Sequence, residues 1–496
     1  MATRNLELLS FDLGASNGRA VLGRFDGERL VLEEMHRFEN GPVDIDGIPH
    51  WDAASILGHL KSGFSAYRAQ GGTALSAFGI DTWGVDYGLL DAKGLLLANP
   101  RAYRASTDAA MNAAWDVVPK LRLFDRCGLA AMNFNTVYQL YRRKLDGDEA
   151  LEKARTLLLM PDLLGYLLTG EKKTEYTNAT TTNLYNPRER NWDWATLREL
   201  GLPERLFTEI DRAGQLRGRL TSAVAKELSL GRTPFAAVGT HDTASAVAAI
   251  PGHGNFAFCS SGTWSLFGVE TDEPVLTDAM YDGNFSNEGT VQGGFRPLKN
   301  IMGLWPLQEC RREWNAGVHK LSWDEIEQAA EAATPFRSLV DPDWGPFFAA
   351  GDMTDKIRRY CRATKQPVPD SVGEVARCIF ESLAVKYRWA VERLEGIKGA
   401  PLDTLHIVGG GVKQKILNRM AADATGRRVV TGPTEGACAG NLLMQAVALG
   451  ELAGLDEARE VVLRSFETHE YEPHPTQEWQ DAYAKLLRLM DTEVTT

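Results

Sequence analysis

One pattern occurs twice in this chain of 496 residues and constrains its fold more than any other feature. An apolar strand ends in a turn of small and polar residues, and a second strand follows at once. The first copy spans residues 6–25 and the second spans residues 255–269. Sequence identity between the copies is slight. The pattern therefore predicts a repeated structure, two domains that open with the same strand–turn–strand unit.

The elements after the first copy favour a mixed sheet. Asp26-Gly27 is a typical hairpin turn, and a third strand with rough alternation follows at residues 30–38. A helical pattern at residues 53–68 and a strand at residues 77–80 come next. Three antiparallel strands followed by helix–strand alternation predict an α/β fold, with a mixed sheet flanked by helices in each domain.

The length of the chain suits two or three domains at roughly 150 residues each. The loop at residues 250–254, which contains one proline and two glycines, marks the expected boundary. We therefore expect a first domain at residues 1–248, with a mostly helical stretch at about 109–230. A second domain is expected at residues 249–472, and an amphipathic helix within residues 473–496 is expected to pack on it.

The composition excludes several classes of partner. The formal net charge is −12 and no clustered basic face is evident, so nucleic acid is not an expected partner. The most apolar run, residues 157–168, is interrupted by Pro161 and Asp162 and is too short to span a bilayer. Residues 1–12 lack a secretory signal pattern, so we expect a cytoplasmic protein with no membrane partner. No heptad repeat specifies an oligomeric state.

The six cysteines are sparse, and none belongs to a C-x-x-C pair. A zinc or redox site of that type is therefore not expected, and buried, reduced thiols are. Cys361 and Cys378 bracket a loop that contains proline, and these two could pair under oxidation. The chain also lacks a Gly-x-x-x-x-Gly-Lys phosphate loop and a protein-kinase catalytic loop.

The first polar turn could bind phosphate. Asp12 ends the strand, and the turn and the start of the next strand comprise Gly14, Ala15, Ser16, Asn17, Gly18 and Arg19. Glycine permits close backbone approach, and successive N–H groups in such a turn can form an anion-binding nest. Asp12 could hold a hydrated Mg²⁺, which prefers one or two carboxylates together with phosphate oxygens. The alternative is an ordinary hairpin turn.

A later strand end also carries a carboxylate. Residues 235–238 form a short apolar strand that runs into Gly239, Thr240, His241, Asp242 and Thr243. A general base must lie within hydrogen-bond reach of the hydroxyl that it deprotonates, and strand ends position side chains well. Asp242 is therefore a candidate base. The alternative is that it only caps the helix that follows.

Two glycine-containing turns follow in the second half. Residues 260–263, Ser-Ser-Gly-Thr, form a second candidate phosphate turn or an ordinary hairpin. Residues 409–411 are three glycines between a strand and a helix, which suits flat contact with a nucleotide. A helix N-terminus there also favours anions.

The order of these motifs resembles that of the FGGY carbohydrate kinases, members of the actin-like ATPase superfamily. The resemblance extends from about residue 6 to residue 449. Longer strings, among them residues 11–16, 79–86 and 299–305, are similar to those of the L-rhamnulose kinases within this family. The resemblance implies two actin-like (ribonuclease H-like) domains with a cleft between them, which bind a sugar and ATP.

The resemblance also implies roles for individual residues. Asp242 would be the proton acceptor, and Mg²⁺ would lie near Asp12. The expected sugar contacts are Gly84, His241, Asp242, Thr243 and Asn300. The expected contacts with ATP are Ala15, Ser16, Asn17, Gly18, Arg19, Thr263, Gln308 and Gly410.

The implied reaction transfers a phosphoryl group from ATP to O1 of L-rhamnulose. One departure from the family pattern follows Tyr103-Arg104, where an acid and a second arginine are usual. Here Ala105 and Thr107 occupy those places, which could relax sugar selectivity. The alternatives are a kinase for another ketose such as L-fuculose or L-xylulose, a catalytically silent sugar sensor, and an actin-like ATPase. The site residues, not the fold alone, decide among these.

Overall fold

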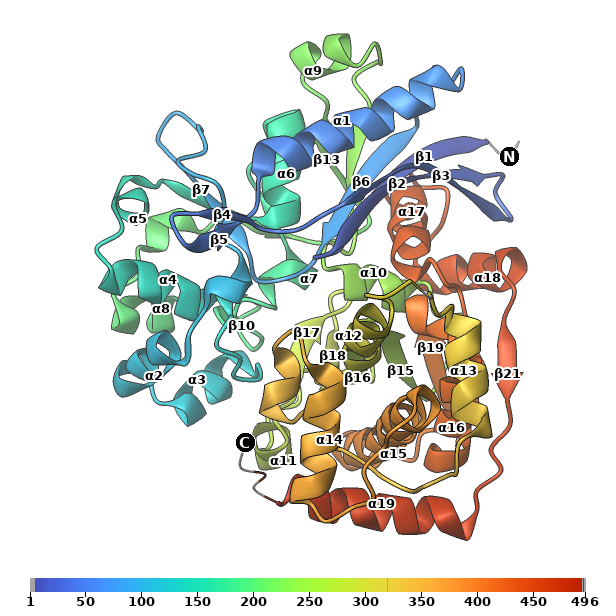
Figure 1. Ribbon diagram of the computed structural model, residues 1–496. Coiled ribbons are helices and arrows are strands. Elements are labelled where there is room, and N and C mark those ends of the chain that lie inside the picture. Colours follow the sequence, from blue (N-terminus) through green and yellow to red (C-terminus); the bar gives the residue numbers. More distant parts are fainter. Residues whose placement is uncertain (1–4, 319, 493, 495–496) are drawn as a thin grey trace. The chain divides into compact units, whose positions relative to one another are not determined.

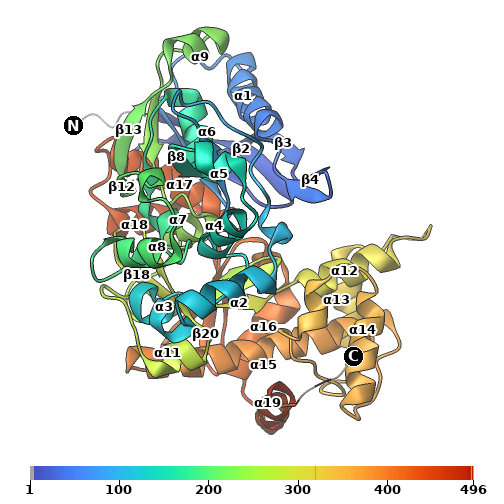
Figure 2. The same cartoon turned by 90° about the vertical axis from the view of Figure 1, so that its left-hand side faces the viewer.

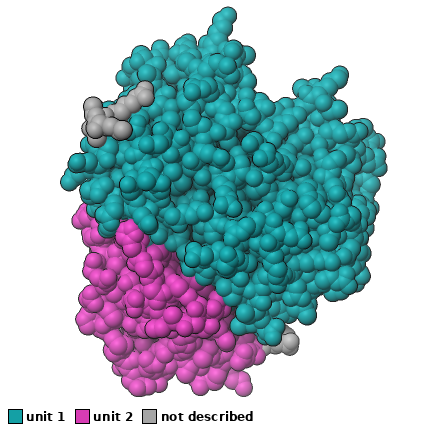
Figure 3. Space-filling view, turned by 180° about the vertical axis from the view of Figure 1, so that it is seen from behind, with its two compact units in different colours: residues 1–250, 270–297, 436–466 teal, residues 251–269, 298–435, 467–496 magenta. Residues whose placement is uncertain are grey.

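The computed structural model describes residues 5–318, 320–492 and 494 (Figure 1). The chain divides into two compact units, coloured teal and magenta in Figure 3. Unit 1 contains residues 1–250, 270–297 and 436–466. Unit 2 contains residues 251–269, 298–435 and 467–496.

The core of unit 1 is a six-stranded mixed sheet in the order β13-β14-β6-β1-β2-β3. β1 is antiparallel to β2 and parallel to β6, and β6 is parallel to β14. The carboxyl ends of β1, β6 and β14 therefore lie at one edge of the sheet. The strands are β1 (Leu6–Leu13), β2 (Asn17–Phe25), β3 (Leu30–Glu39), β6 (Ala77–Thr82), β13 (Gln215–Arg219) and β14 (Pro234–Ala237).

Helices cover both faces of this sheet because both sets of alternating side chains are apolar. On β1, Leu9, Phe11 and Leu13 belong to the core cluster shared with α1 (Ala53–Ala69) and α6 (Met160–Thr169). Leu6 and Leu8 belong to the cluster shared with α17 (Gly436–Ala448) and α18 (Leu455–Ser465).

Close contact between α17 and α10 (Asp242–Ala248) depends on a glycine. A Cβ atom at Gly440 would lie 1.8 Å from the backbone oxygen of Ser245. A larger residue would therefore push α17 away from the helix that carries the candidate base.

The middle of unit 1 is mostly helical, as the sequence predicts, and includes several short strands. Its apolar core is separate from the core beneath α1 and centres on Leu140, Leu159 and Trp192. The remaining helices of unit 1 are α2 (Asp108–Val117), α3 (Lys120–Cys127), α4 (Thr136–Leu145), α5 (Glu149–Lys153), α7 (Tyr176–Ala179), α8 (Trp194–Leu200), α9 (Ser222–Glu227) and α11 (Asp278–Asp282), with 3₁₀ turns η1 (Tyr103–Ala105) and η2 (Glu204–Leu206). The remaining short strands of unit 1 are β4 (Val43–Ile45), β5 (Ile48–His50), β7 (Tyr87–Leu90), β8 (Thr156–Leu159), β9 (Thr174–Glu175), β10 (Tyr185–Asn186), β11 (Asn191–Trp192) and β12 (Ile210–Asp211).

A second mixed sheet has the order β17-β18-β16-β15-β19-β20-β21. β15 is antiparallel to β16 and parallel to β19, which is parallel to β20. This repeats the arrangement of β1, β2, β6 and β14, so the predicted α/β repeat is confirmed. The strands are β15 (Phe256–Ser261), β16 (Trp264–Gly268), β17 (Ser286–Gly289), β18 (Phe295–Met302), β19 (Thr404–Val408), β20 (Arg428–Thr431) and β21 (His469–Tyr471).

The longest helix of unit 2 is α15 (Val372–Lys398), which begins at a capping box formed by Ser371 and Glu374. The predicted C-terminal amphipathic helix is α19 (Gln477–Met490), which packs against α15 and α16 (Figure 2). The other helices are α12 (Trp305–Trp314), α13 (Trp323–Ala332), α14 (Met353–Ala363) and α16 (Lys415–Thr425), with 3₁₀ turns η3 (Gly345–Phe348) and η4 (Gly410–Lys413). Among the described helices, none has the length and apolarity needed to cross a membrane.

The units differ from the expected linear division at residues 1–248, 249–472 and 473–496. Two segments of the expected second domain, residues 270–297 and 436–466, belong to unit 1. The physical reason for the second is that α17 buries Cys438, Leu442 and Leu443 against the sheet of unit 1. A hydrophobic pattern shows that a helix is buried but not which sheet covers it.

All six cysteines are buried and none forms a disulfide in the structure. Cys361 lies in α14 and Cys378 in α15. Pairing of these two under oxidation stays a prediction.

Candidate active site

The strand ends of unit 1 bring three carboxylates into one region. Asp12 at the end of β1 is the register partner of Asp81 in β6. The backbone N–H of Thr82 donates to the carbonyl of Thr240 at 2.9 Å, which extends the sheet beyond β14. Asp242 follows two residues later as the first residue of α10. The separate strand-end motifs of the sequence therefore meet at the edge where parallel strands end.

Asp12 is paired with Arg19 across the β1–β2 hairpin. The Arg19 Nε and Nη2 atoms donate to Asp12 Oδ2 at 3.0 Å and 2.7 Å. The Cys438 thiol donates to the same oxygen at 3.5 Å. Arg19, expected from the sequence as a contact for ATP, thus lies beside the candidate metal ligand and offsets its charge.

Asp81 is a buried acid that the sequence motifs did not single out. Burial, and then the negative charge of Asp12, raise the pKa of Asp81 well above its ordinary value. The Asn441 amide donates to Asp81 Oδ2 at 2.5 Å, while Oδ1 has no partner in the part of the chain that the structure describes. The signal that could have revealed Asp81 is its place at the end of the strand parallel to β1.

Asp242 presents one bonded and one open carboxylate oxygen. Oδ1 accepts hydrogen bonds from Thr243 N at 2.5 Å and Thr243 Oγ1 at 3.1 Å. Among the described residues none donates to Oδ2, and the side chain is 31% exposed. The N-cap of α10 is His241, and Asp242 is the acidic residue of the first turn. Burial and the charge of Asp12 raise the pKa of Asp242, and His241 lowers it in part.

Hydrogen bonds to its backbone fix the turn after Asp12, and its exposed side chains are polar. Gly14 N donates to the carbonyl of Asn17 at 2.8 Å, and Asn40 bonds the backbone of both Gly14 and Ser16. A Cβ atom at Gly18 would overlap the Phe38 ring at 2.3 Å, so only glycine fits there. The Ser16 and Asn17 side chains are exposed and Ala15 is half-buried, an arrangement suited to a phosphate nest.

Gly84 lies in a strained loop between β6 and β7. Val85 has φ of 69°, a conformation that branched residues rarely adopt. Its N–H donates to Thr181 Oγ1 at 3.1 Å, and its carbonyl accepts from Thr136 Oγ1 at 2.6 Å. A Cβ atom at Gly84 would lie 2.9 Å from Thr181 Oγ1. The loop therefore needs glycine at position 84 and contacts with other segments that hold Val85 in place.

Asp86 supplies that support, a role that the string at residues 79–86 did not reveal. Its Oδ2 accepts from Trp51 Nε1 at 2.6 Å, Trp83 Nε1 at 3.0 Å and Tyr103 N at 3.1 Å. Its Oδ1 accepts from Gln139 Nε2 at 3.1 Å. Burial raises the pKa of Asp86 to about 6 despite these four donors. Four segments distant in sequence thus meet at one carboxylate.

Glu175 performs a similar task for the segment before Asp242. Its Oε2 accepts from the N–H and hydroxyl groups of both Thr177 and Thr240, at 2.5–3.1 Å. The Thr177 hydroxyl in turn accepts from His241 N at 3.1 Å. Glu175 Oε1 has no partner in the described chain. A single carboxylate oxygen therefore fixes the backbone that leads to the candidate base.

This asymmetry predicts different effects of two substitutions at Glu175. Glu175→Gln can place its amide oxygen at the Oε2 position, so we expect kcat to stay within about threefold. Glu175→Ala leaves four buried donors without an acceptor, at about 1–3 kcal/mol for each group that cannot relax. We expect it to lower both the free energy of unfolding and kcat. Urea unfolding and initial rates for the two variants check this. Equal effects would mean that Glu175 does not act through Oε2.

The candidate nucleotide residues form their own cluster in unit 2. Thr263 Oγ1 donates to Gln308 Oε1 at 3.1 Å. Gly410 is exposed with open space around it, while a Cβ atom at Gly411 would lie 2.0 Å from Ser261 Oγ. The triple glycine therefore packs directly on the β15–β16 hairpin and leaves a flat backbone surface.

Asn300, expected near the sugar, lies in the part of β18 that belongs to unit 2. It is the register partner of Leu266 in β16. Its buried Oδ1 has no hydrogen-bond partner among the described residues. Asn300 Oδ1 could therefore accept a hydrogen bond from a ligand. The sugar contacts of the sequence prediction are thus divided between units, with Gly84, His241, Asp242 and Thr243 in unit 1.

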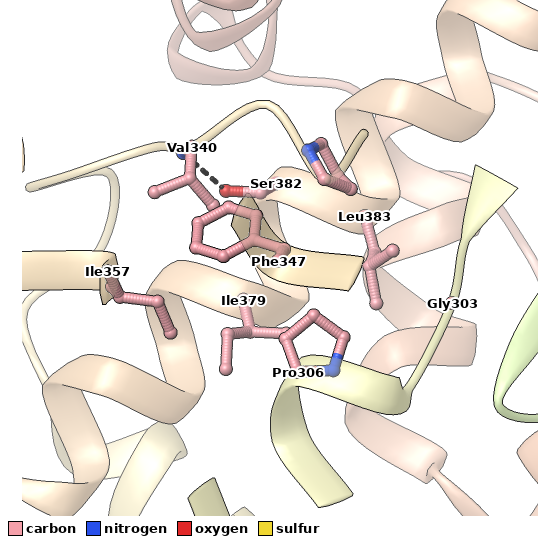
Figure 4. A pocket seen from close by; sticks show the side chains of 9 residues that line it. Gly303, Pro306, Val340, Phe347, Ile357, Ile379, Ser382 and Leu383 are labelled. Atoms are coloured by element: carbon pink, nitrogen blue, oxygen red, sulfur yellow. Dashed lines mark hydrogen bonds between the residues drawn. The ribbon is translucent and has the colours of Figure 1, made fainter. Parts of the chain in front are cut away.

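Two cavities lie within unit 2. One has a volume of about 10 Å³, room for about one water, and is enclosed by apolar side chains including Phe347, Ile379 and Leu383 (Figure 4). A wider groove of about 480 Å³ lies between α14 and α19 and is lined in part by Lys365 and Lys485. Neither contains a residue expected to bind sugar or nucleotide.

Two family models cover most of the chain. The N-terminal domain of the FGGY family of carbohydrate kinases matches residues 8–249, and the C-terminal domain of the same family matches residues 257–449. The chain belongs to the FGGY family of carbohydrate kinases. The two matched ranges are separated by residues 250–256.

Curated FGGY kinases resemble this chain along nearly its whole length. A rhamnulokinase of Bacteroides thetaiotaomicron is 42% identical, covering 95% of this chain and 97% of its own. A rhamnulokinase of Bacillus subtilis is 36% identical, covering 94% of this chain and 95% of its own. Among solved structures, a xylulose kinase from Lactobacillus acidophilus is 15% identical with a TM-score of 0.79, covering 97% of this chain and 96% of its own. That likeness shows the two-domain α/β fold.

Proposed function

We propose that this carbohydrate kinase transfers the γ-phosphoryl group of ATP to O1 of L-rhamnulose, giving L-rhamnulose 1-phosphate and ADP. The observation that carries the proposal is the open Oδ2 of Asp242, at the strand ends of a chain whose 36–42% identical relatives are rhamnulokinases. ATP is abundant in the cytoplasm, so we propose that compartment for the reaction.

The proposed chemistry needs few groups, because phosphoryl transfer depends mainly on alignment and charge neutralisation. Asp242 Oδ2 accepts the O1 proton as the oxygen–phosphorus bond forms and the bond to ADP breaks. The raised pKa of Asp242 suits proton uptake at neutral pH. Gly84, His241, Thr243 and Asn300 hold the sugar.

We propose separate contacts for the nucleotide. The turn residues Ala15, Ser16, Asn17 and Gly18 and the side chain of Arg19 face the phosphates. Thr263, Gln308 and Gly410 hold the nucleoside from unit 2. The exposed turn and the flat glycine backbone support these assignments.

A magnesium ion fits the acids near the turn. Asp12 and Asp81 are opposed in the β1–β6 register, and the charge of Asp12 contributes to the raised pKa of Asp81. Asp81 Oδ1 is buried without a partner among the described residues. A cation would relieve this repulsion, and Mg²⁺ needs only one or two carboxylates beside phosphate oxygens and water. We propose Asp12 as its ligand, with charge neutralisation at the phosphates as its contribution.

A kinase for another ketose is the second candidate. Ala105 ends η1, and Thr107 is the N-cap of α2 without a side-chain capping bond. Both lie close in sequence to Tyr103, whose pKa is raised by burial, then by the charge of Asp86 and last by that of Asp242, while Arg104 lowers it. A change in this segment can therefore alter the sugar pocket.

The experiment measures ADP release with Mg²⁺-ATP and L-rhamnulose, L-fuculose, L-xylulose, L-ribulose, D-fructose or glycerol. We expect the highest kcat/KM for L-rhamnulose. A higher kcat/KM for another ketose would keep the proposed mechanism but show that this other ketose is the substrate. No stimulation by any polyol would contradict the kinase proposal for this chain.

A further inference from the structure

A buried cluster of charged residues adjoins Asp242 within unit 1. Glu288 in β17 is 5% exposed, and Arg296 in β18 is fully buried. His241, which precedes α10, lies between Glu288 and Asp242 and is 7% exposed. No part of the proposed chemistry above uses Glu288 or Arg296.

The two nitrogens of the His241 ring face different carboxylates. Nδ1 lies 3.1 Å from Glu288 Oε2, and Nε2 lies 3.5 Å from Asp242 Oδ1. Arg296 Nη2 lies 3.3 Å from the same Glu288 oxygen, and Arg296 Nε donates to the Gly289 carbonyl at 2.8 Å. A single ring therefore connects Glu288 to the candidate base.

Glu288 is a suitable acceptor for the ring. Burial alone raises the pKa of Glu288, but His241 and then Arg296 outweigh burial, so the net pKa lies below its ordinary value. The hydrogen bond made at one imidazole nitrogen decides which nitrogen carries the proton and how the ring is turned. A carboxylate can only accept, so Nε2 can hold Asp242 Oδ1 only if it carries a hydrogen as well as Nδ1, which donates to Glu288.

Burying these charged side chains costs desolvation free energy that apolar side chains would not. Ion pairs buried in a protein are often no more stabilising than apolar side chains of similar volume. Arg296 Nη1 is also buried without a partner among the described residues. Such a costly cluster next to the candidate base favours a functional role over a purely structural one.

We propose that Glu288, held by Arg296, is a positioning residue for phosphoryl transfer. It orients the His241 ring so that an N–H group at Nε2 faces Asp242 Oδ1. Together with Thr243 this fixes the carboxylate with Oδ2 towards the sugar hydroxyl. The proposal rests on the proposed function of Asp242 as the base.

A double-mutant cycle tests the proposal with the best ketose. We expect Glu288→Gln to lower kcat by roughly 10–100-fold, the range seen for groups that orient metal-binding histidines. The Kd for sugar should change less than kcat. Because Glu288 acts through His241, the double variant His241→Asn/Glu288→Gln should be no slower than His241→Asn alone.

Glu381→Gln is the matched control. Glu381 in α15 is a buried carboxylate paired with an arginine, Arg377, in unit 2 and outside the candidate site. We expect it to lower Tm while the folded enzyme keeps its kcat. Glu288→Gln behaving like this control, or adding fully to His241→Asn in the double variant, would overturn the proposal.

A second measurement is independent of turnover. The chain has nine histidines, so ¹⁵N-histidine spectra can be assigned, with His241→Asn identifying one signal. We expect His241 to carry a hydrogen on both ring nitrogens, and to lose one of them or change its ring environment in Glu288→Gln. An unchanged signal would overturn the proposal. If the signal changes but no ketose is phosphorylated, only the proposed function fails.

Discussion

Replacing Asp242 with asparagine is expected to lower kcat by about 10²–10⁴-fold, the usual contribution of a general base. Asparagine keeps an oxygen that can accept from Thr243, so the start of α10 should be preserved. It offers no carboxylate oxygen at the open position to take up the O1 proton. Because the shape is conserved, the Kd values for sugar and ATP should change little. Steady-state rates and calorimetric binding measure the two quantities.

Asp278→Asn provides the control for this result. Asp278 is also the first residue of a helix in unit 1, α11, but it is exposed and lies outside the candidate site. We expect full activity. An Asp242→Asn enzyme that retains most of its turnover would show that another group, or the sugar hydroxyl alone, manages the proton.

Replacing Asp86 with alanine is expected to destabilise unit 1 by roughly 3–5 kcal/mol, the cost of breaking a buried charged network. Two indole N–H groups, an amide and a backbone N–H would lose their shared acceptor in a dry environment. The loop around Gly84 and Val85 would also lose its anchor. We therefore expect kcat/KM for the sugar to fall as well, by up to about 10²-fold, as displacements of about 1 Å can cause.

Urea unfolding and sugar-dependence of the rate separate these effects. Asp146→Asn is the control, because Asp146 follows α4, the helix that carries Gln139, but is exposed and pairs with Arg142. A change at such a surface site is expected to stay within about 0.5 kcal/mol. Asp86→Ala with normal stability and a normal KM would mean that the loop around Gly84 is held by Thr136 and Thr181 alone.

The features that the sequence predicts here are those encoded locally. Alternating apolar residues and turn glycines located the strands around Asp12 and the hairpins of both sheets. They also located Asp242, because it follows an apolar strand directly. The resemblance of whole motifs then indicated a sugar kinase, and the family matches confirm it.

The residues that the sequence did not reveal act over long separations. Asp86 binds Trp51 and Gln139, and Glu288 faces His241 about fifty residues away along the chain. Nothing local marks such an acid as buried, since its partners are known only once the chain is folded. The same limit explains the linear domain division. The apolar pattern of α17 predicts burial but not the sheet against which it packs.

The position of α17 has a consequence for synthesis of the protein. One face of the unit 1 sheet, lined by Leu6, Leu8, Val21 and Phe25, is covered by residues that lie after residue 435. While the ribosome is translating the intervening segment, this apolar face has no covering helix. Unit 1 can therefore reach its final structure only near the end of translation. A fragment that stops at residue 250 would expose this apolar surface and be prone to aggregate. The first half of this kinase therefore cannot be treated as an independent folding module.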